Sequence, residues 1–259
     1  MNLLKMILMT VAAGYLGLAL FALVFANRMI FPQPPSSYSD SDAIIKIPYG
    51  DEGYKISALF LPHEQADRIV FYHHGNGEDL GRSQGRLELL REQGFAVFAW
   101  DYPGYGTSTG RPNERRIMEA AQASMQYIVE ELGFSKEQVI LYGRSLGGGP
   151  AVQLAEDHSV AGVILEGTFT STFRVLTRVR LLPWDVFDNL SRIDRIQAPL
   201  LIIHGTLDYT IPYSHSLALY QRAKDPKTLV TVDTGGHNNL VEDFAEIYWE
   251  AVDTFIQSL

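Results

Sequence analysis

Short runs of residues that are apolar on both faces alternate with helical segments along most of this 259-residue chain. The runs at 69–72, 97–100 and 200–203 carry apolar side chains at consecutive positions. A strand with one face in water would instead alternate apolar with polar residues. Because strands of this kind need helices over both faces, we expect an α/β fold with a mostly parallel, doubly wound sheet.

The strands and their connections indicate one domain with one insertion. Two alternating runs joined by Gly-Asp-Glu-Gly predict an antiparallel hairpin at the entry to the sheet. The interval 168–199 is too apolar for a simple connection, so we predict a small cap at about 170–198, over the carboxyl ends of the strands. The last segment, 240–259, has the periodicity of an amphipathic helix. We predict eight strands, at residues 44–49, 56–61, 69–73, 96–101, 139–142, 162–166, 200–204 and 228–232.

A segment of 21 residues without a charged side chain, 6–26, precedes this domain. As a helix it is long enough to cross a bilayer core of about 30 Å. We therefore interpret residues 1–27 as a transmembrane anchor, with a signal peptide cleaved after Ala26 and a secreted product as the alternative. Lys5 in front of the segment favours a domain on the non-cytoplasmic side. The proline-rich stretch within 28–41 predicts an extended linker, so the folded domain is expected at 42–259.

Composition excludes several classes of function. The formal net charge is -9 and no cluster of Lys and Arg is evident, which argues against a nucleic-acid partner. The chain has no cysteine, so disulfides, thiolate nucleophiles and cysteine-ligated metals are excluded.

One pentapeptide carries the strongest chemical signal. Gly143-Arg144-Ser145-Leu146-Gly147 follows a predicted strand and opens a predicted helix. In this context Gly-x-Ser-x-Gly forms a sharp turn that exposes the serine, and its glycines avoid collisions with the neighbouring strand and helix. A phosphate-binding loop is a poor alternative, because the glycine run lies inside the helix and no Gly-Lys-Ser/Thr sequence is present. We therefore predict Ser145 as a nucleophile.

A serine hydroxyl needs a base, and the base needs an acid that fixes its tautomer. In chains with this turn the order is serine, acid, histidine. Asp208 follows the strand at 200–204 and His237 lies in the loop before the last helix. Both positions put a side chain at the carboxyl edge of the sheet, so we predict Asp208 as the acid and His237 as the base. Glu166, at the end of the sixth strand, is the alternative acid.

The oxyanion formed during acyl transfer must be met by aimed N–H donors. We predict the backbone N–H of Leu146 and that of Asn76, which lies in a glycine-rich loop after the third strand. Tyr105 and Phe169 are the candidate substrate-pocket residues. Two adjacent histidines at 73 and 74 point to opposite faces of a strand, without a carboxylate at ligand spacing, so no metal is expected.

With these motifs the chain resembles the single-pass, membrane-anchored α/β-hydrolase-domain proteins, whose relatives include protein depalmitoylases and lysophospholipid lipases. The resemblance implies the α/β-hydrolase fold and ester or thioester hydrolysis without a cofactor, and it supports the roles given above. One departure is the lack of the N-terminal cysteines that palmitoylated depalmitoylases use for anchoring. The matching stretches cover 28–32, 74–76, 101–106, 143–148, 165–169, 204–208 and 235–238.

These observations predict a serine hydrolase acting on lipid-like or small acyl esters or thioesters near a membrane. A serine peptidase of the same fold is the first alternative, although the small cap offers little room for the carboxylate that binds a substrate amine. A non-catalytic, membrane-tethered binding module is the second. It is disfavoured because all three triad residues and both elbow glycines are present.

Overall fold

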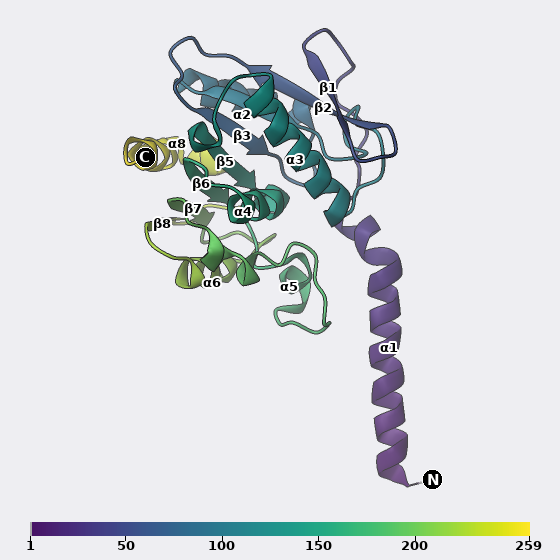
Figure 1. Ribbon diagram of the computed structural model, residues 1–259. Helices are drawn as coiled ribbons and strands as arrows, with labels where there is room; N and C mark the ends of the chain where they lie inside the picture. Colours follow the sequence, from purple (N-terminus) through teal and green to yellow (C-terminus); the bar gives the residue numbers. More distant parts are fainter. Residues whose placement is uncertain (1) are drawn as a thin grey trace.

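The computed structural model describes residues 2–259, and its centre is one eight-stranded sheet in the order β1-β2-β4-β3-β5-β6-β7-β8 (Figure 1). β1 pairs antiparallel with β2, β2 pairs antiparallel with β4, and all other pairs are parallel. The predicted mostly parallel, eight-stranded α/β-hydrolase sheet is thus confirmed. The strands are β1 Ile44–Tyr49, β2 Tyr54–Leu61, β3 Ile69–His73, β4 Ala96–Trp100, β5 Val139–Arg144, β6 Gly162–Glu166, β7 Leu200–Gly205 and β8 Lys227–Val232.

Helices cover both faces of the sheet, which explains why its central strands are apolar at consecutive positions. Successive residues of β3 enter two different cores: Ile69 and Phe71 pack with α3 and α4, whereas Val70 and Tyr72 pack with α2 and α8. All five residues of β3 are buried. The helices of the domain are α2 Leu80–Glu92, α3 Glu114–Glu130, α4 Gly148–Asp157, α5 Thr172–Thr177, α6 Ser214–Arg222, α7 Leu240–Asp243 and α8 Ala245–Gln257.

The C-terminal segment differs from the prediction of one helix over 240–259. The backbone leaves the helical region at Phe244, with φ -128° and ψ 32°, and this separates α7 from α8. The break lets both short helices face the sheet, because Leu240 of α7 and Val252 of α8 are buried in the same core.

The cap connects β6 to β7 and is mostly irregular. It contains α5, and Asp185 ties the start of the cap to its middle, because its carboxylate accepts hydrogen bonds from the Ser171 hydroxyl at 2.6 Å and the Phe173 N–H at 3.0 Å. In Figure 1 the cap lies on the same side of the domain as the N-terminal helix α1 (Leu3–Ile30), which projects away from the sheet. α1 has a mean hydropathy of 2.3 in its most apolar window and none of that window is buried.

The segment after α1 is extended, but it is fixed to the domain rather than free. Phe31 is 2% exposed and packs edge-on against Phe187 of the cap. The Ser37 N–H donates to Asp79 at 2.6 Å, and the Tyr38 hydroxyl donates to Asp101 at 2.5 Å. The sequence places the start of the folded domain near residue 42, whereas packing against it begins at Phe31. Proline content predicts an extended backbone, but it does not reveal which side chains that backbone buries.

Candidate active site

The turn after β5 holds Ser145 in an unusual backbone conformation, and two glycines beside it give this turn the space it needs. Ser145 has φ +51°, in the left-handed region that residues other than glycine rarely adopt. A Cβ added to Gly147 would lie 2.0 Å from the carbonyl oxygen of His73, and one added to Gly143 would lie 2.6 Å from the carbonyl oxygen of Gly147. Gly147 therefore lets the turn approach β3 closely, and Gly143 lets β5 lie close to the start of α4, so that Ser145 is presented at the carboxyl edge of the sheet.

The side chains of Ser145, His237 and Asp208 lie within hydrogen-bonding distance of one another, in that order, at this edge of the sheet. The Nε2 atom of His237 lies 3.0 Å from the Oγ atom of Ser145. The Nδ1 atom of His237 lies 2.6 Å from Oδ2 of Asp208. Asp208 comes from the loop after β7 and His237 from the loop between β8 and α7, so these loops meet the turn after β5 at one point.

Asp208 lies in a site built for a negative charge. Its side chain is 1% exposed, yet its Oδ1 atom accepts the backbone N–H groups of Thr210 at 2.8 Å and Ile211 at 2.7 Å. Burial alone would raise the pKa of Asp208, but hydrogen bonds from His204 and His237 outweigh it and hold this pKa well below its usual value. The carboxyl is thus ionised throughout the physiological pH range.

His204 is a partner of this acid that sequence reasoning missed. It is the next-to-last residue of β7 and is fully buried, and its Nε2 atom lies 3.1 Å from Oδ2 of Asp208 and 2.8 Å from the carbonyl oxygen of Ile211. Its Nδ1 atom lies 2.6 Å from the Ser216 hydroxyl. A histidine four residues before the predicted acid is a feature of the sequence that could have indicated this contact. The orientation of its ring, however, depends on the hydroxyl of Ser216 in α6.

The alternative acid, Glu166, does not face His237. It is 1% exposed and accepts hydrogen bonds from Arg86 at 2.8 Å and from the hydroxyl of Tyr248 at 2.8 Å. A second buried cation, Arg144, lies 3.3 Å from it. Glu166 therefore neutralises two arginines in the core behind the turn, which is a structural role.

Arg144, directly before Ser145, joins the loops around the site. Its guanidinium contacts Glu78 of the loop after β3, Glu166 of β6, and the side-chain oxygen of Asn238 at 2.7 Å. Burial alone would lower the pKa of Arg144, but Glu166 and Glu78 outweigh it and raise that pKa. Sequence reasoning treated this residue as an unspecified position of the motif, and its three partners are far away in the chain.

A cavity of about 670 Å³ opens beside Ser145, and both residues predicted to stabilise an oxyanion, Asn76 and Leu146, line it. Phe169, predicted for the substrate pocket, lines it as well. Tyr105 does not: it is fully buried, with its ring centroid 5.6 Å from that of His74, so its assignment to the pocket was wrong. Tyr105 belongs to the loop after β4, and its ring is buried edge-on against that of Tyr102, with the ring centroids 5.6 Å apart.

The same cavity has walls that sequence reasoning did not find. Met29 and Ile30 of α1 and Leu176 of the cap line it together with Ser145. The carbonyl oxygen of Ile30 accepts a hydrogen bond from the Asn76 side chain at 2.9 Å. The end of α1 is therefore part of the site.

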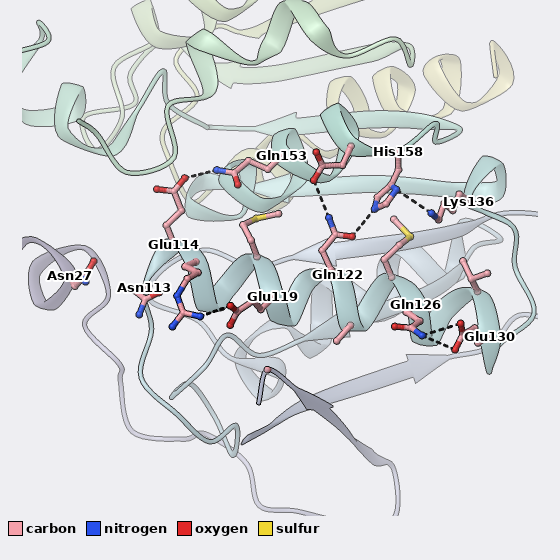
Figure 2. A pocket seen from close by; sticks show the side chains of 17 residues that line it. Asn27, Asn113, Glu114, Glu119, Gln122, Gln126, Glu130, Lys136, Gln153 and His158 are labelled. Carbon is pink, nitrogen blue, oxygen red and sulfur yellow. Dashed lines mark hydrogen bonds and ion pairs between the residues drawn. The ribbon is translucent and has the colours of Figure 1, made fainter. Parts of the chain in front are cut away.

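A larger hollow, of about 1310 Å³, lies over α3, and none of the three triad residues lines it (Figure 2). Figure 2 shows several of its polar side chains paired with one another, among them Glu114 with Gln153 and Gln126 with Glu130. The His158 ring lies 2.7 Å from Gln122 and 3.2 Å from Lys136. Among residues 2–259, no group of three or more His, Cys, Asp or Glu could hold a metal ion. The arrangement suited to chemistry is therefore the one at Ser145.

Several known proteins are similar to this chain in sequence, and others are similar to it in fold. Human alpha/beta hydrolase domain-containing protein 17B is 35% identical over 209 residues, which cover 79% of this chain and 72% of the relative. The chain belongs to the family of α/β-hydrolase-domain serine hydrolases. This confirms the resemblance seen in the motifs. A second relative, alpha/beta hydrolase domain-containing protein aho-3 of Caenorhabditis elegans, is 34% identical over 76% of this chain and 60% of that protein.

Two further comparisons agree with this membership. A family model described as "Serine aminopeptidase, S33" matches residues 64–183. An esterase from Pyrococcus furiosus superposes with a TM-score of 0.71 at 16% identity, covering 87% of this chain and 97% of that one. The ferulic acid complex of Est1E from Butyrivibrio proteoclasticus gives 0.68 at 18% identity, covering 83% and 98%. At such low identity these two structures show the fold alone.

Proposed function

We propose that this serine hydrolase cleaves carboxylic ester or thioester bonds through an acyl-enzyme on Ser145. The observation that carries the proposal is the line of hydrogen-bonding distances from Ser145 through His237 to Asp208, which is the arrangement that activates a serine hydroxyl. The position of Ser145 on a strained turn beside an open cavity gives it access to a substrate carbonyl.

In the first half of the reaction, Oγ of Ser145 attacks the acyl carbon while Nε2 of His237 takes its proton. Asp208 holds the Nδ1–H of His237 and stabilises the imidazolium that forms. The backbone N–H groups of Asn76 and Leu146 donate to the oxyanion. The proton then passes from His237 to the departing alcohol or thiol, and the acyl group stays on Ser145.

In the second half, water replaces the leaving group. His237 takes a proton from this water, the hydroxide adds to the acyl carbon, and the bond to Oγ of Ser145 breaks. The same histidine returns the proton to Ser145, so the acid product leaves and the enzyme is restored. No other group needs to gain or lose a proton.

We propose further that α1 is retained and anchors the protein in a membrane, with the catalytic domain on the non-cytoplasmic side. Its 28 residues exceed the roughly 20 needed to span a bilayer. Retention is also supported by the residues at its end, because Met29 and Ile30 line the cavity at Ser145. The same anchor would keep the site close to lipid-like acyl substrates.

A peptidase is the second candidate, since the matching family model is described as a serine aminopeptidase. An aminopeptidase needs a free carboxylate for the substrate amine. The carboxylate that lines the cavity, Glu78, already pairs with Arg144 and accepts the Gly75 N–H at 2.9 Å. The ester or thioester assignment therefore fits the cavity better.

The test combines labelling with substrate comparison. A fluorophosphonate should modify Ser145 and no other serine, because only a serine activated by a base attacks this electrophile. The labelled peptide is identified by mass spectrometry, with Ser145→Ala as the control. Persistent labelling in that variant would contradict the nucleophile. Faster cleavage of aminoacyl anilides than of p-nitrophenyl esters would favour the peptidase.

A further inference from the structure

A second, apolar hollow continues from the cavity at Ser145. It is a groove of about 170 Å³ between α1 and the cap, with Phe21, Ala22 and Ala26 on one side and Phe173 and Leu181 on the other. Apolar cavities of roughly 150 Å³ accept a molecule as large as benzene. The groove therefore has room for hydrocarbon.

The groove and the catalytic cavity share four residues, so they form one path. Met29, Ile30, Thr172 and Leu176 line both hollows. Three of these four residues are apolar, so the boundary between the groove and the space beside Ser145 is mostly apolar.

One face of α1 is shaped for this groove. Leu18, Ala22 and Ala26 recur at intervals of four residues and so lie on the same side of the helix. The two alanines are small and leave space between α1 and the cap. Val24 lies on the opposite side, where it is 60% exposed.

The cap is itself apolar beside the groove. Leu176 is 77% exposed, Val179 59% and Leu181 47%. Clustered exposed apolar side chains of this kind mark a surface that meets a partner or a membrane. Their place next to a helix long enough to span a bilayer makes lipid the matching environment.

From these contacts we propose that α1 and the cap form the acyl-chain subsite, in which a long acyl chain of a bilayer-held ester lies with its carbonyl at Ser145. The inference rests on the proposed esterase function and deepens it. A chain that moves from the bilayer into an apolar groove stays in an apolar medium, whereas exposure to water is unfavourable for every CH₂ group. The membrane helix is thus one wall of the active site as well as an anchor.

The test uses the full chain in phosphatidylcholine vesicles, with two p-nitrophenyl esters that differ only in the acyl group. Ala22→Trp fills the groove, and Val24→Trp adds the same ring on the opposite side of α1. For Ala22→Trp we expect kcat/KM to fall about tenfold or more on the palmitate ester and to stay within about twofold on the butyrate ester. Val24→Trp should change neither. Unchanged palmitate hydrolysis in Ala22→Trp, or an equal loss in both variants, would overturn the subsite.

A second measurement does not depend on a variant that folds. A long-chain alkyl fluorophosphonate with a diazirine at the end of its chain is attached to Ser145 of the unchanged protein and photolysed. Crosslinks are expected in residues 18–30 or 172–182. Crosslinks only elsewhere in the domain, with Ser145 labelled, would overturn the subsite alone. If even a short fluorophosphonate fails to label Ser145, the proposed function falls, and the subsite falls with it.

Discussion

At the scale of single residues, the proposed roles depend on a few polar contacts in a buried setting. Asp208 accepts two backbone N–H groups and lies against two histidines, and this accounts for its lowered pKa. Asp101 is buried too, but fewer donors reach it. The same residue type is therefore ionised in one place, whereas in the other it keeps its proton up to about pH 7.

Replacing Asp208 by Asn should leave the fold intact and lower kcat by about 10⁴, because an amide holds the wrong tautomer of His237. The rate of ester hydrolysis measures kcat, and circular dichroism shows whether the fold is intact. Asp233→Asn is the matched control: its carboxylate accepts the Thr206 hydroxyl at 3.1 Å, beside the same loop, and we expect near wild-type kcat. A mild effect of Asp208→Asn would show that another residue orients the base.

Asp101 should make stability depend on pH. Burial raises its pKa from 3.8 to about 7, and hydrogen bonds from Tyr38 and Leu80 only partly oppose this. The folded protein therefore holds a proton that the unfolded chain has already lost. Stability should fall as pH rises from about 4 to about 7, by at most roughly 4 kcal/mol, and then level off.

The urea midpoint at each pH measures this effect. Asp101→Asn cannot ionise, so its stability should decline less over the same range. Equal slopes for the two proteins would show that Asp101 does not hold the extra proton.

At the scale of elements, the site is a set of loops brought together by the register of parallel strands. His73 of β3 pairs with Gly143 of β5, and Arg144 of β5 pairs with Glu166 of β6. The loops after these strands therefore leave the sheet at the same edge and at the same register. The distances between these loops depend on how closely β3 and α4 can approach.

Gly147→Ala should disturb this approach, since its Cβ would lie 2.0 Å from the carbonyl oxygen of His73. A contact this short to backbone cannot be relieved without moving β3 or α4, so we expect a loss of about 1–3 kcal/mol in the free energy of unfolding. Activity should also fall. In Gly85→Ala, by contrast, the added Cβ in α2 meets no atom within 4 Å. This control should gain up to about 1 kcal/mol.

At the scale of the whole molecule, the segment that joins α1 to the domain is packed against the domain and is not a free linker. Phe31 is buried against the cap, and Gln33 donates to the carbonyl oxygen of Gly104 at 3.1 Å. A cut made inside this segment therefore removes part of the domain.

Removal of residues 1–27 should yield a soluble protein that still hydrolyses short esters, because the contacts of Phe31 remain. Removal of residues 1–35 should cost a further 3 kcal/mol or so, the usual loss for a buried phenylalanine. Urea unfolding of the two truncated proteins measures the difference. Equal urea midpoints would show that Phe31 contributes little to the stability of the domain.

The full chain should stay with membranes through a carbonate wash, since an apolar helix that satisfies its own backbone hydrogen bonds loses much by leaving lipid. Fractionation followed by mass spectrometry of the N-terminus checks this. A soluble product that begins after Ala26 would show that the segment is a cleaved signal peptide.

The sequence by itself determines the features that depend on neighbouring residues. Consecutive apolar positions predict a sheet covered on both faces, and the spacing of Gly143 and Gly147 around Ser145 predicts the turn after β5. These predictions succeed because backbone sterics and side-chain periodicity act over a few residues. The order of Ser145, Asp208 and His237 then follows from the strands that precede them.

Tertiary structure alone decides which distant groups become partners. The ring of His204 is held by the Ser216 hydroxyl of α6 at 2.6 Å, and Glu166 faces Arg86, 80 residues earlier, rather than His237. The stacking of Tyr105 inside the domain and the place of Ile30 in the cavity depend equally on long-range packing. Such contacts are set by how whole helices and strands fit together, and a local pattern of residues carries no record of that fit.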